Sequence, residues 1–567
     1  MNLVQFLNKV DETISGYDCE KLLRIIHEIA RTLPEQERKD FIKQIKQIDN
    51  NDTSNINKKD NNKLETEYKK ICDKFIEIEN GDIFLREEYN DEYDDWYNST
   101  VEEILYEDPD GIGSVICEAC SFVHKCIDVE NYELALKMGR KLFMQSVQTN
   151  GEYSGEDLSL MDLQYYHVCS FNYRGLLLDT LYACYQVAEP QKRPDIMYEI
   201  WANAEDEDIK LENVMQYGGQ ELKDVDDFIS DWIGYLGTKK GYLAERLYKE
   251  AVNLSDDVEA KFENAKKYVN NHPGIYLEIL NDSSVKRELA LKIGMDGVKR
   301  IDRQLIVRSK VALKTVEIAK SEGKDSELIE QLYMDAFESD TCATNYLRVF
   351  INCKDKNLSK IKMREIIDRY NGKEGKHFLG GYGGKSELDK NVISENMMYI
   401  LRFLDGEFLG VLNSGVSSKE ALGWSCTFMK EGLAIYLLYL FNGKPMHSEI
   451  KKMLNITKNA FGSDYDDESF YTIFLLWKST TQMSDSDKKK IINHIDKLVQ
   501  KRVAGIMDAN KRNYYGECAM YIAALGEVMN AKQDYMSKFA AQYSRRRTAY
   551  TTGKNISIRI IINFRNI

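Results

Sequence analysis

The sequence predicts an all-α fold: a degenerate α-solenoid of helix pairs, with a small N-terminal helical unit and a more compact C-terminal helical part. Apolar residues recur at helical spacing along almost the whole chain of 567 residues, and only six prolines interrupt them. One helix pair follows another after roughly 35–45 residues, an irregular spacing within the range of several repeat families. Such chains grow by adding repeats around a long surface.

The composition supports a folded chain with many wet helix faces. Hydrophobic residues make up 43% and charged residues 30% of the sequence. There are 92 acidic and 77 basic residues, which gives a net charge of −15. This charge opposes non-specific binding to nucleic acid or to anionic membranes, although it is compatible with a local basic groove.

The cysteines and the apolar runs indicate a cytoplasmic location. Eleven cysteines are scattered through the chain, mostly inside apolar stripes, as is usual for reduced thiols in a cytosolic core. The first fifteen residues lack a basic region followed by an apolar stretch, so we expect no signal peptide. The longest apolar run, Gly432–Phe441, is too short to cross a bilayer of about 30 Å. It predicts a buried helix, and we expect a soluble protein without membrane contact.

The N-terminal part divides into a helical unit and a linker. Residues 1–48 carry three apolar stripes, and Pro34 suits the first turn of the third helix. Residues 49–63 contain one apolar residue in fifteen, so they cannot bury a face and are predicted to be a flexible polar linker.

The main array is predicted over residues 64–371. Its first clear pair joins a stripe within 116–127 to a second helix with Tyr132, Ala135 and Gly139. This tyrosine–alanine–glycine pattern is typical of tetratricopeptide pairs, in which small residues let two helices approach closely. Further helical segments are predicted at 165–188, 195–204, 243–269, 285–294, 302–320 and 326–337. The array is therefore expected to be tetratricopeptide-like.

A Gly-rich segment, residues 372–386, separates the array from a C-terminal helical domain over 387–547. Its Gly-Lys-Ser ending resembles a phosphate loop, but that pattern needs glycine where Leu379 stands and a preceding strand that is not predicted. We therefore interpret it as a connector. Residues 548–567 form an atypical basic, strand-like tail.

Cys117, Cys120 and His124 are candidate metal ligands because their spacing of three and four residues places them on one side of a helix. Cys126 points away, so a four-ligand zinc site would need a broken helix. The continuous apolar stripe argues against a break. A cluster of structural thiols is the favoured interpretation, and no metal is expected.

Two surface segments are candidate partner-binding sites. The acidic–aromatic segment 86–98, with Tyr89, Tyr93 and Trp96, suits a basic partner. The favoured alternative is a solvated helix start, because charge runs commonly form wet faces.

The second candidate is a basic cluster for an acidic peptide or RNA, although its spacing circles the helix rather than forming one stripe. It consists of Arg300, Arg303, Arg308, Lys310 and Lys314.

The sequence carries no catalytic or cofactor-binding motif. The seven histidines are isolated from one another, and HExxH, GxSxG and paired CxxC patterns are absent. We name no catalytic residue and no cofactor. Distant residues can still converge into an active site, as triads do, so an enzyme stays an alternative.

Three segments resemble a group of large all-helical bacterial proteins, some of which carry or accompany a SWIM-type zinc finger. They are Ile293–Leu313, Tyr333–Phe350 and Tyr514–Arg547. The resemblance implies a tetratricopeptide-like helical fold. The SWIM ligands, Cys-x-Cys followed by Cys-x-His, are absent, so no zinc role is implied. The group continues after the arginine run with a charged helix, and an altered terminus is our hypothesis for the different tail.

Three functions are compatible with these observations. The leading hypothesis is a non-catalytic scaffold that binds a protein or peptide, because stacked helix pairs create a long surface. A nucleic-acid-linked accessory factor in defence against mobile elements is the second, although the net charge disfavours it. The third is an enzyme with an unrecognised site in the C-terminal helical domain.

Overall fold

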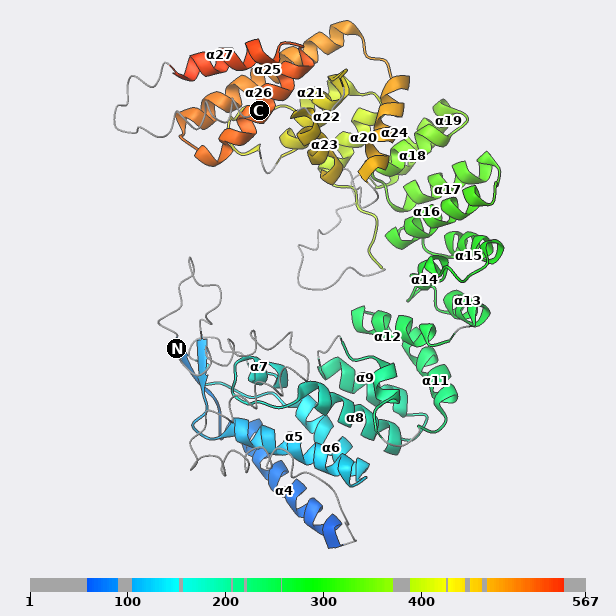
Figure 1. Cartoon of the computed structure of the whole chain (residues 1–567), viewed down its shortest axis with the longest axis vertical. Helices are drawn as coiled ribbons and strands as arrows, with labels where there is room; N and C mark the ends of the chain where they lie inside the picture. Colours follow the sequence, from blue (N-terminus) through cyan, green and yellow to red (C-terminus); the bar gives the residue numbers. More distant parts are fainter. Residues whose placement is uncertain are drawn as a thin grey trace, which may run out of the picture. The chain divides into compact units, whose positions relative to one another are not determined.

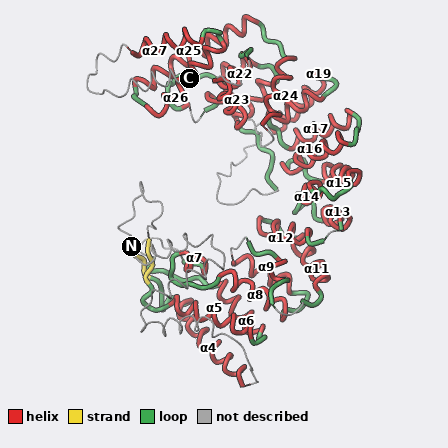
Figure 2. The backbone as a smooth tube through the Cα atoms, in the orientation of Figure 1, coloured by secondary structure: helices red, strands yellow, loops and turns green. Residues whose placement is uncertain are grey.

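The computed structural model confirms the nearly all-α fold (Figures 1 and 2). It describes residues 59–89, 104–151, 157–204, 208–218, 222–255, 257–370, 388–424, 427–443, 449–460 and 467–544. The chain divides into two compact units, Met1–Leu254 (unit 1) and Ser255–Ile567 (unit 2). The boundary falls inside the predicted array of residues 64–371. The predicted helical unit 1–48, the Gly-rich connector 372–386 and the tail 548–567 lie outside the described residues.

The described part of unit 1 contains a two-stranded sheet and a series of helices. The strands are β1 (Arg86–Tyr89) and β2 (Ile104–Glu107). The helices are α4 (Lys59–Glu79), α5 (Ile112–Asp128), α6 (Tyr132–Met144), α7 (Leu160–Tyr165), α8 (Tyr173–Val187), α9 (Arg193–Ala204), α10 (Leu211–Met215), α11 (Val225–Gly237) and α12 (Tyr242–Asn253). Helix α4 therefore begins inside the predicted linker 49–63.

Helices α5, α6 and α8 pack against one another and form the centre of unit 1. Gly139 in α6 permits this close approach, because an added Cβ would lie 2.2 Å from Thr180 Oγ1 in α8. Next to them, α9 and α11 meet through Trp201 and Trp232, whose ring centroids are 5.9 Å apart. Both tryptophans are fully buried, so this part of the unit has a large aromatic core.

The expected helix start in segment 86–98 is wrong for its described residues, because Arg86–Tyr89 form strand β1, which pairs antiparallel with β2. The register of this pair places Glu87 opposite Tyr106. The Glu87 backbone N–H donates to Asn150 Oδ1 at 3.0 Å, and Thr149 donates its hydroxyl to the Glu87 carboxylate at 2.7 Å. These partners lie more than 60 residues away in sequence, so tertiary contacts override the local charge pattern.

Unit 2 begins with helices that pack in sequence order (Figure 1). They are α13 (Val258–Lys267), α14 (Ile275–Asn281), α15 (Arg287–Arg300), α16 (Ile306–Ser321), α17 (Ser326–Ser339), α18 (Ala343–Asn352) and α19 (Lys356–Tyr370). Each helix contacts the next, and several also contact the second along, such as α14 with α16. This is the packing expected of stacked helix pairs.

The same type of close helix contact occurs within each of the two units. Gly294 in α15 lies against Thr315 in α16, where an added Cβ would stand 2.1 Å from the threonine Oγ1. The sequence around it, Glu288–Gly294 (ELALKIG), nearly repeats Glu133–Gly139 (ELALKMG) in α6. Thr315 and its counterpart in α8 both donate to the carbonyl four residues earlier. The same local sequence therefore builds the same close approach twice.

The later helices of unit 2 are more apolar. They are α20 (Glu395–Leu404), α21 (Phe408–Ser414), α22 (Met429–Leu440), α23 (Glu449–Ala460), α24 (Asp467–Thr480), α25 (Asp485–Asp508), α26 (Tyr515–Val528) and α27 (Lys532–Ser544). All nine residues of Gly432–Leu440 are buried, which confirms the buried helix predicted from the apolar run. No helix in the described ranges has the length and apolar content needed to cross a membrane.

Candidate functional site

A groove in unit 2 lies between α14, α16, α17 and α18 and encloses about 500 Å³. Helix α16 provides most of its lining, because residues spaced three or four apart share one side of a helix. Lys310, Lys314, Glu317 and Lys320 follow this spacing. The remaining lining residues are Leu277, Asn281, Leu313, Val316, Tyr333 and Arg348.

Four cations and a single carboxylate line the groove. Lys314 Nζ lies 2.9 Å from the Glu317 carboxylate, so one charge pair lies on its rim. Lys320 donates to the Tyr333 hydroxyl at 2.8 Å and lies 5.1 Å from the centroid of that ring. Lys310 is exposed and makes no side-chain hydrogen bond or ion pair with the described residues. The groove therefore keeps a net positive charge.

A buried polar network positions Arg348 at the groove. Its guanidinium donates to Asn345 Oδ1 at 2.8 Å, and the Asn345 amide donates to the Asp340 carboxylate at 3.1 Å. Burial raises the pKa of Asp340, against the opposing effects of its hydrogen bonds and nearby cations, Lys310 among them. The charge of Lys310 in the groove therefore acts on the buried Asp340 carboxyl group.

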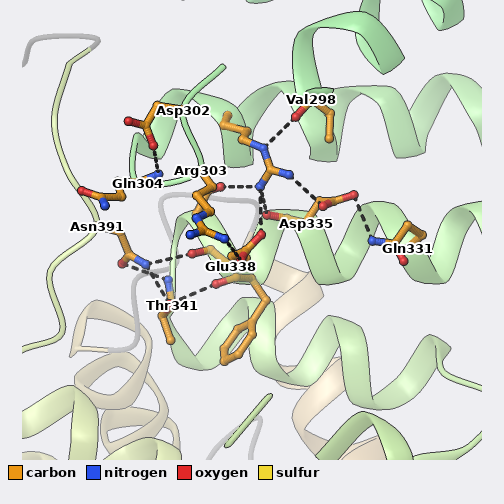
Figure 3. Close-up of polar contacts among 12 residues, drawn as sticks. Val298, Asp302, Arg303, Gln304, Gln331, Asp335, Glu338, Thr341 and Asn391 are labelled. Atoms are coloured by element: carbon orange, nitrogen blue, oxygen red, sulfur yellow. Dashed lines mark hydrogen bonds and ion pairs between the residues drawn. The ribbon is translucent and has the colours of Figure 1, made fainter. Parts of the chain in front are cut away.

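Arg308 fixes α16 to both of its neighbours (Figure 3). Its guanidinium donates to the Val298 carbonyl at 2.7 Å and to Asp335 Oδ1 at 2.8 Å. It also donates to Ser339 Oγ at 2.8 Å. Arg308 is only 7% exposed. Because a planar guanidinium directs its donors in fixed directions, this contact sets how α15 and α17 sit against α16.

Glu338, labelled in Figure 3, lies at the edge of this network, and its carboxylate lies within 4.0 Å of three guanidiniums. The shortest distances from its carboxylate are 3.6 Å to Arg308, 3.9 Å to Arg303 and 2.5 Å to Arg369. The Asn391 amide donates to the Glu338 carbonyl at 3.2 Å and to Thr341 Oγ1 at 2.7 Å. The network therefore links α17 to α16 and to α19.

The structure separates the basic residues that the sequence groups together. Lys310 and Lys314 line the groove. Arg300 pairs with Asp296 at 2.8 Å on α15, and Arg303 lies near Glu338. Arg308 is buried in the network and is not available to a partner.

Sequence reasoning missed Lys320, Tyr333 and Arg348 as groove residues. Lys320 continues the three-and-four spacing from Lys310 and Lys314, and this signal could have identified it. Tyr333 and Arg348 lie on other helices, and no local pattern connects them to α16.

The candidate metal ligands occupy one face of α5 in unit 1, where His124 is bound to a carboxylate. His124 Nδ1 lies 3.1 Å from Asp179 Oδ2, and Tyr217 donates its hydroxyl to the other oxygen of Asp179 at 2.6 Å. The hydrogen bond to Asp179 raises the pKa of His124, although burial opposes it. No group of three or more potential ligands is arranged around a metal position in the described residues.

The remaining sequence candidates are the aromatic residues of segment 86–98. Tyr89 lies on β1 and is 45% exposed, while Tyr93 and Trp96 lie outside the described residues.

In the C-terminal helical domain, Glu517 forms an ion pair with the buried Arg502 at 3.0 Å. Glu527 accepts hydrogen bonds from two backbone N–H groups at the start of α23. Both acids therefore have structural partners.

No protein-family model matches the sequence, and no curated protein matches it. The groove, with its charge and its lining, is therefore the feature on which a function is proposed.

Proposed function

We propose that this chain is a non-catalytic helical-repeat scaffold, and that the groove of unit 2 binds an acidic, partly apolar segment of a partner protein. The observation that carries the proposal is the lining, in which four cations and one carboxylate stand among apolar side chains. A volume of about 500 Å³ accommodates a few side chains of a bound segment and falls within the range of known ligand sites.

The lining favours a peptide over a nucleic acid. Glu317 is exposed at the rim, where its charge repels phosphate. Tyr333 is only 8% exposed and accepts a hydrogen bond from Lys320, so its ring offers little face for base stacking. The net charge of −15 also opposes a polyanion. A segment with both carboxylate and apolar side chains complements both kinds of lining.

Lys310 and Lys314 would meet the acidic side chains of the partner. The apolar stems of lysine can lie along Leu313 while the ammonium groups stay in water. Charges at a rim mainly increase the association rate and make it depend on salt. Arg348, held in place by Asn345, would offer a planar donor pair to one carboxylate.

The test measures fluorescence anisotropy of a labelled helix-forming peptide of about 15 residues with leucine on one face and glutamate on the other. A second peptide carries glutamine in place of each glutamate. We expect the full-length chain to bind the glutamate peptide and to lose that affinity as salt is raised. The glutamine peptide should bind much more weakly.

The variant K310Q/K314Q removes two groove charges, and K299Q/K324Q removes two exposed lysines outside the groove. Both variants have a net charge of −17, since −15 − 2 = −17. We expect the groove variant to lose roughly 2- to 30-fold in affinity, at about 0.2–1 kcal/mol per exposed charge pair. The control variant should bind like the unchanged chain.

Three results would overturn the proposal. The first is no binding of the glutamate peptide even at low salt. The second is equal loss of affinity in the two variants, which would indicate a general charge effect. The third is tighter binding of single-stranded RNA with a steep salt dependence, which would favour the nucleic-acid function instead.

A further inference from the structure

Helix α5 of unit 1 contacts the chain between α7 and α8 at two successive turns. At the first turn, a Cβ added to Gly113 would lie 2.2 Å from the Val168 carbonyl oxygen. At the next turn, Cys117 Sγ lies 3.4 Å from the Ser170 carbonyl oxygen. Cys169 stands between these two contact points. Both chain neighbours of Cys169 therefore contact α5, and the Cys169 thiol is a side-chain hydrogen-bond partner of Cys117.

The start of α5 is fixed firmly enough to maintain this contact. The Asp108 carboxylate accepts the backbone N–H groups of Ile112 and Gly113 at 2.7 and 2.8 Å. On the other side, the N–H of Val168 donates to the Leu163 carbonyl at 2.9 Å. Carboxylate capping of this kind stabilises a helix N-terminus. Both partners of the contact are thus held by their own hydrogen bonds.

The two thiols differ in access to solvent. Cys117 is partly exposed, whereas Cys169 is 6% exposed and Cys120, one turn further along α5, is 8% exposed. A small oxidant can therefore reach Cys117 before either neighbour. Cys169 lies directly behind it as a second thiol.

The electrostatics also distinguish the thiols. The hydrogen bond from Cys169 lowers the pKa of Cys117 to about 6, despite the opposing effect of burial. The same hydrogen bond raises the pKa of Cys169, and burial raises the pKa of Cys120. Since the thiolate is the reactive form, Cys117 is the nucleophile of the cluster at neutral pH.

We propose that Cys117 and Cys169 form a reversible disulfide when the protein meets a peroxide, with Cys117 as the attacking thiol and Cys169 as the resolving thiol. The Cys117 thiolate attacks one peroxide oxygen, so an S–O bond forms, the O–O bond breaks and hydroxide leaves. The Cys169 sulfur then attacks Cys117, which forms the S–S bond and breaks the S–O bond. Water leaves with the Cys169 proton.

Two electrons pass from the thiols to the peroxide, which becomes two waters. A dithiol reductant restores both cysteines by thiol–disulfide exchange. The disulfide joins α5 covalently to the connection between α7 and α8. Unit 1 thereby carries a redox-modified site that is independent of the groove in unit 2.

The test treats the reduced full-length chain with hydrogen peroxide, blocks the remaining thiols and maps peptides without reduction. We expect a cross-linked peptide pair containing Cys117 and Cys169, which dithiothreitol separates. Across a pH series, the rate of Cys117 oxidation should reach half its maximum near pH 6, as its pKa predicts. An ordinary thiol would do so near pH 8.5.

Variants separate the two roles. In C169S the Cys117 sulfenic acid should persist, react with dimedone and proceed to sulfinic acid, while in C117S Cys169 should stay reduced. C353S, which removes a buried cysteine in unit 2, should form the same cross-link as the unchanged chain. Far-UV circular dichroism establishes that each variant is folded.

The oxidation products of the unchanged chain test the proposal even if a variant does not fold. A cross-link between Cys117 and Cys120 would contradict the proposed resolving thiol. Direct conversion of Cys117 to sulfinic acid, without any cross-link, would overturn the proposal. So would an oxidation rate at Cys117 no higher than that of Cys353.

Discussion

Replacing Gly294 with alanine should push α15 and α16 apart. The added Cβ would lie 2.1 Å from Oγ1 and 2.9 Å from Cγ2 of Thr315, whereas carbon atoms pack favourably at about 3.5–4.0 Å. Thr315 is β-branched, so its side chain has little freedom to turn away. It also donates to the Val311 carbonyl at 2.7 Å, which fixes its rotamer further.

Two opposing effects determine how much stability G294A loses. Overpacking costs about 1–3 kcal/mol, while alanine in place of glycine improves helix propensity by about 0.8–1 kcal/mol. We therefore expect G294A to destabilise the α15–α16 contact by roughly 0–2 kcal/mol. T315A alone should lose about 1 kcal/mol from the missing methyl group and hydroxyl bond. In G294A/T315A the nearest remaining atom is the residue 315 Cβ at 3.0 Å, so most of the clash is relieved.

The assay is native-state hydrogen exchange followed by mass spectrometry, because it reports the opening free energy of each helix separately. Peptides from α15 and α16 give the response, and peptides from α5 and α6 in unit 1 give an internal reference. The double variant should be more stable than the sum of the single effects by about 1–3 kcal/mol. In G139A/T180A the peptides from α6 and α8 should respond, and those from α15 and α16 should give the reference.

Additive effects of the two substitutions, within about 0.5 kcal/mol, would refute this reasoning. Additivity would mean that the helices already have room for the methyl group. A loss of protection spread evenly over both units would also contradict it, because the contact is local.

Two further predictions concern charged groups. R308M should lower the free energy of unfolding by about 3–5 kcal/mol in denaturant titrations, because it leaves the largely buried Asp335 carboxylate without its cation. The control R300M removes an exposed ion pair and should cost at most about 1 kcal/mol. Similar losses in the two variants would contradict the structural role of Arg308. His124 binds its proton more tightly in the folded state, since the Asp179 hydrogen bond raises its pKa above the unfolded value of about 6.5. The stabilisation that protonated His124 adds to the folded state is therefore full below about pH 6.5 and is lost as pH rises through the folded pKa. The difference in free energy of unfolding between the unchanged chain and H124Q, measured in urea, should shrink from pH 5.5 to 8.5. A constant difference would exclude this linkage.

Helices with strong local signals could be predicted from the sequence. The apolar run Gly432–Phe441 corresponds to the part of α22 in which every residue from Gly432 to Leu440 is buried, and the stripes around Cys120 and Gly139 correspond to α5 and α6. Here burial follows from residue type and spacing alone. The strand Arg86–Tyr89 could not be predicted in this way, because its partners include Asn150 and Thr149, which only the folded chain brings near.

The candidate site was predictable only in part. Lys310 and Lys314 stand out in the sequence as basic residues, and the structure places both in the groove. Arg308 looks the same in the sequence, but its fate depends on Asp335 and Glu338, which lie on another helix. Charge alone therefore does not distinguish a groove cation from a buried structural one.

Glu338 contacts the described chain on both sides of residues 371–387. Arg369, just before this segment, pairs with the Glu338 carboxylate, and Asn391, just after it, donates to the Glu338 carbonyl. The described residues on either side of this segment are thus fixed at one residue of α17. Helix α19 and the residues that precede α20 therefore share a single anchor, although they are separated by more than fifteen residues of sequence.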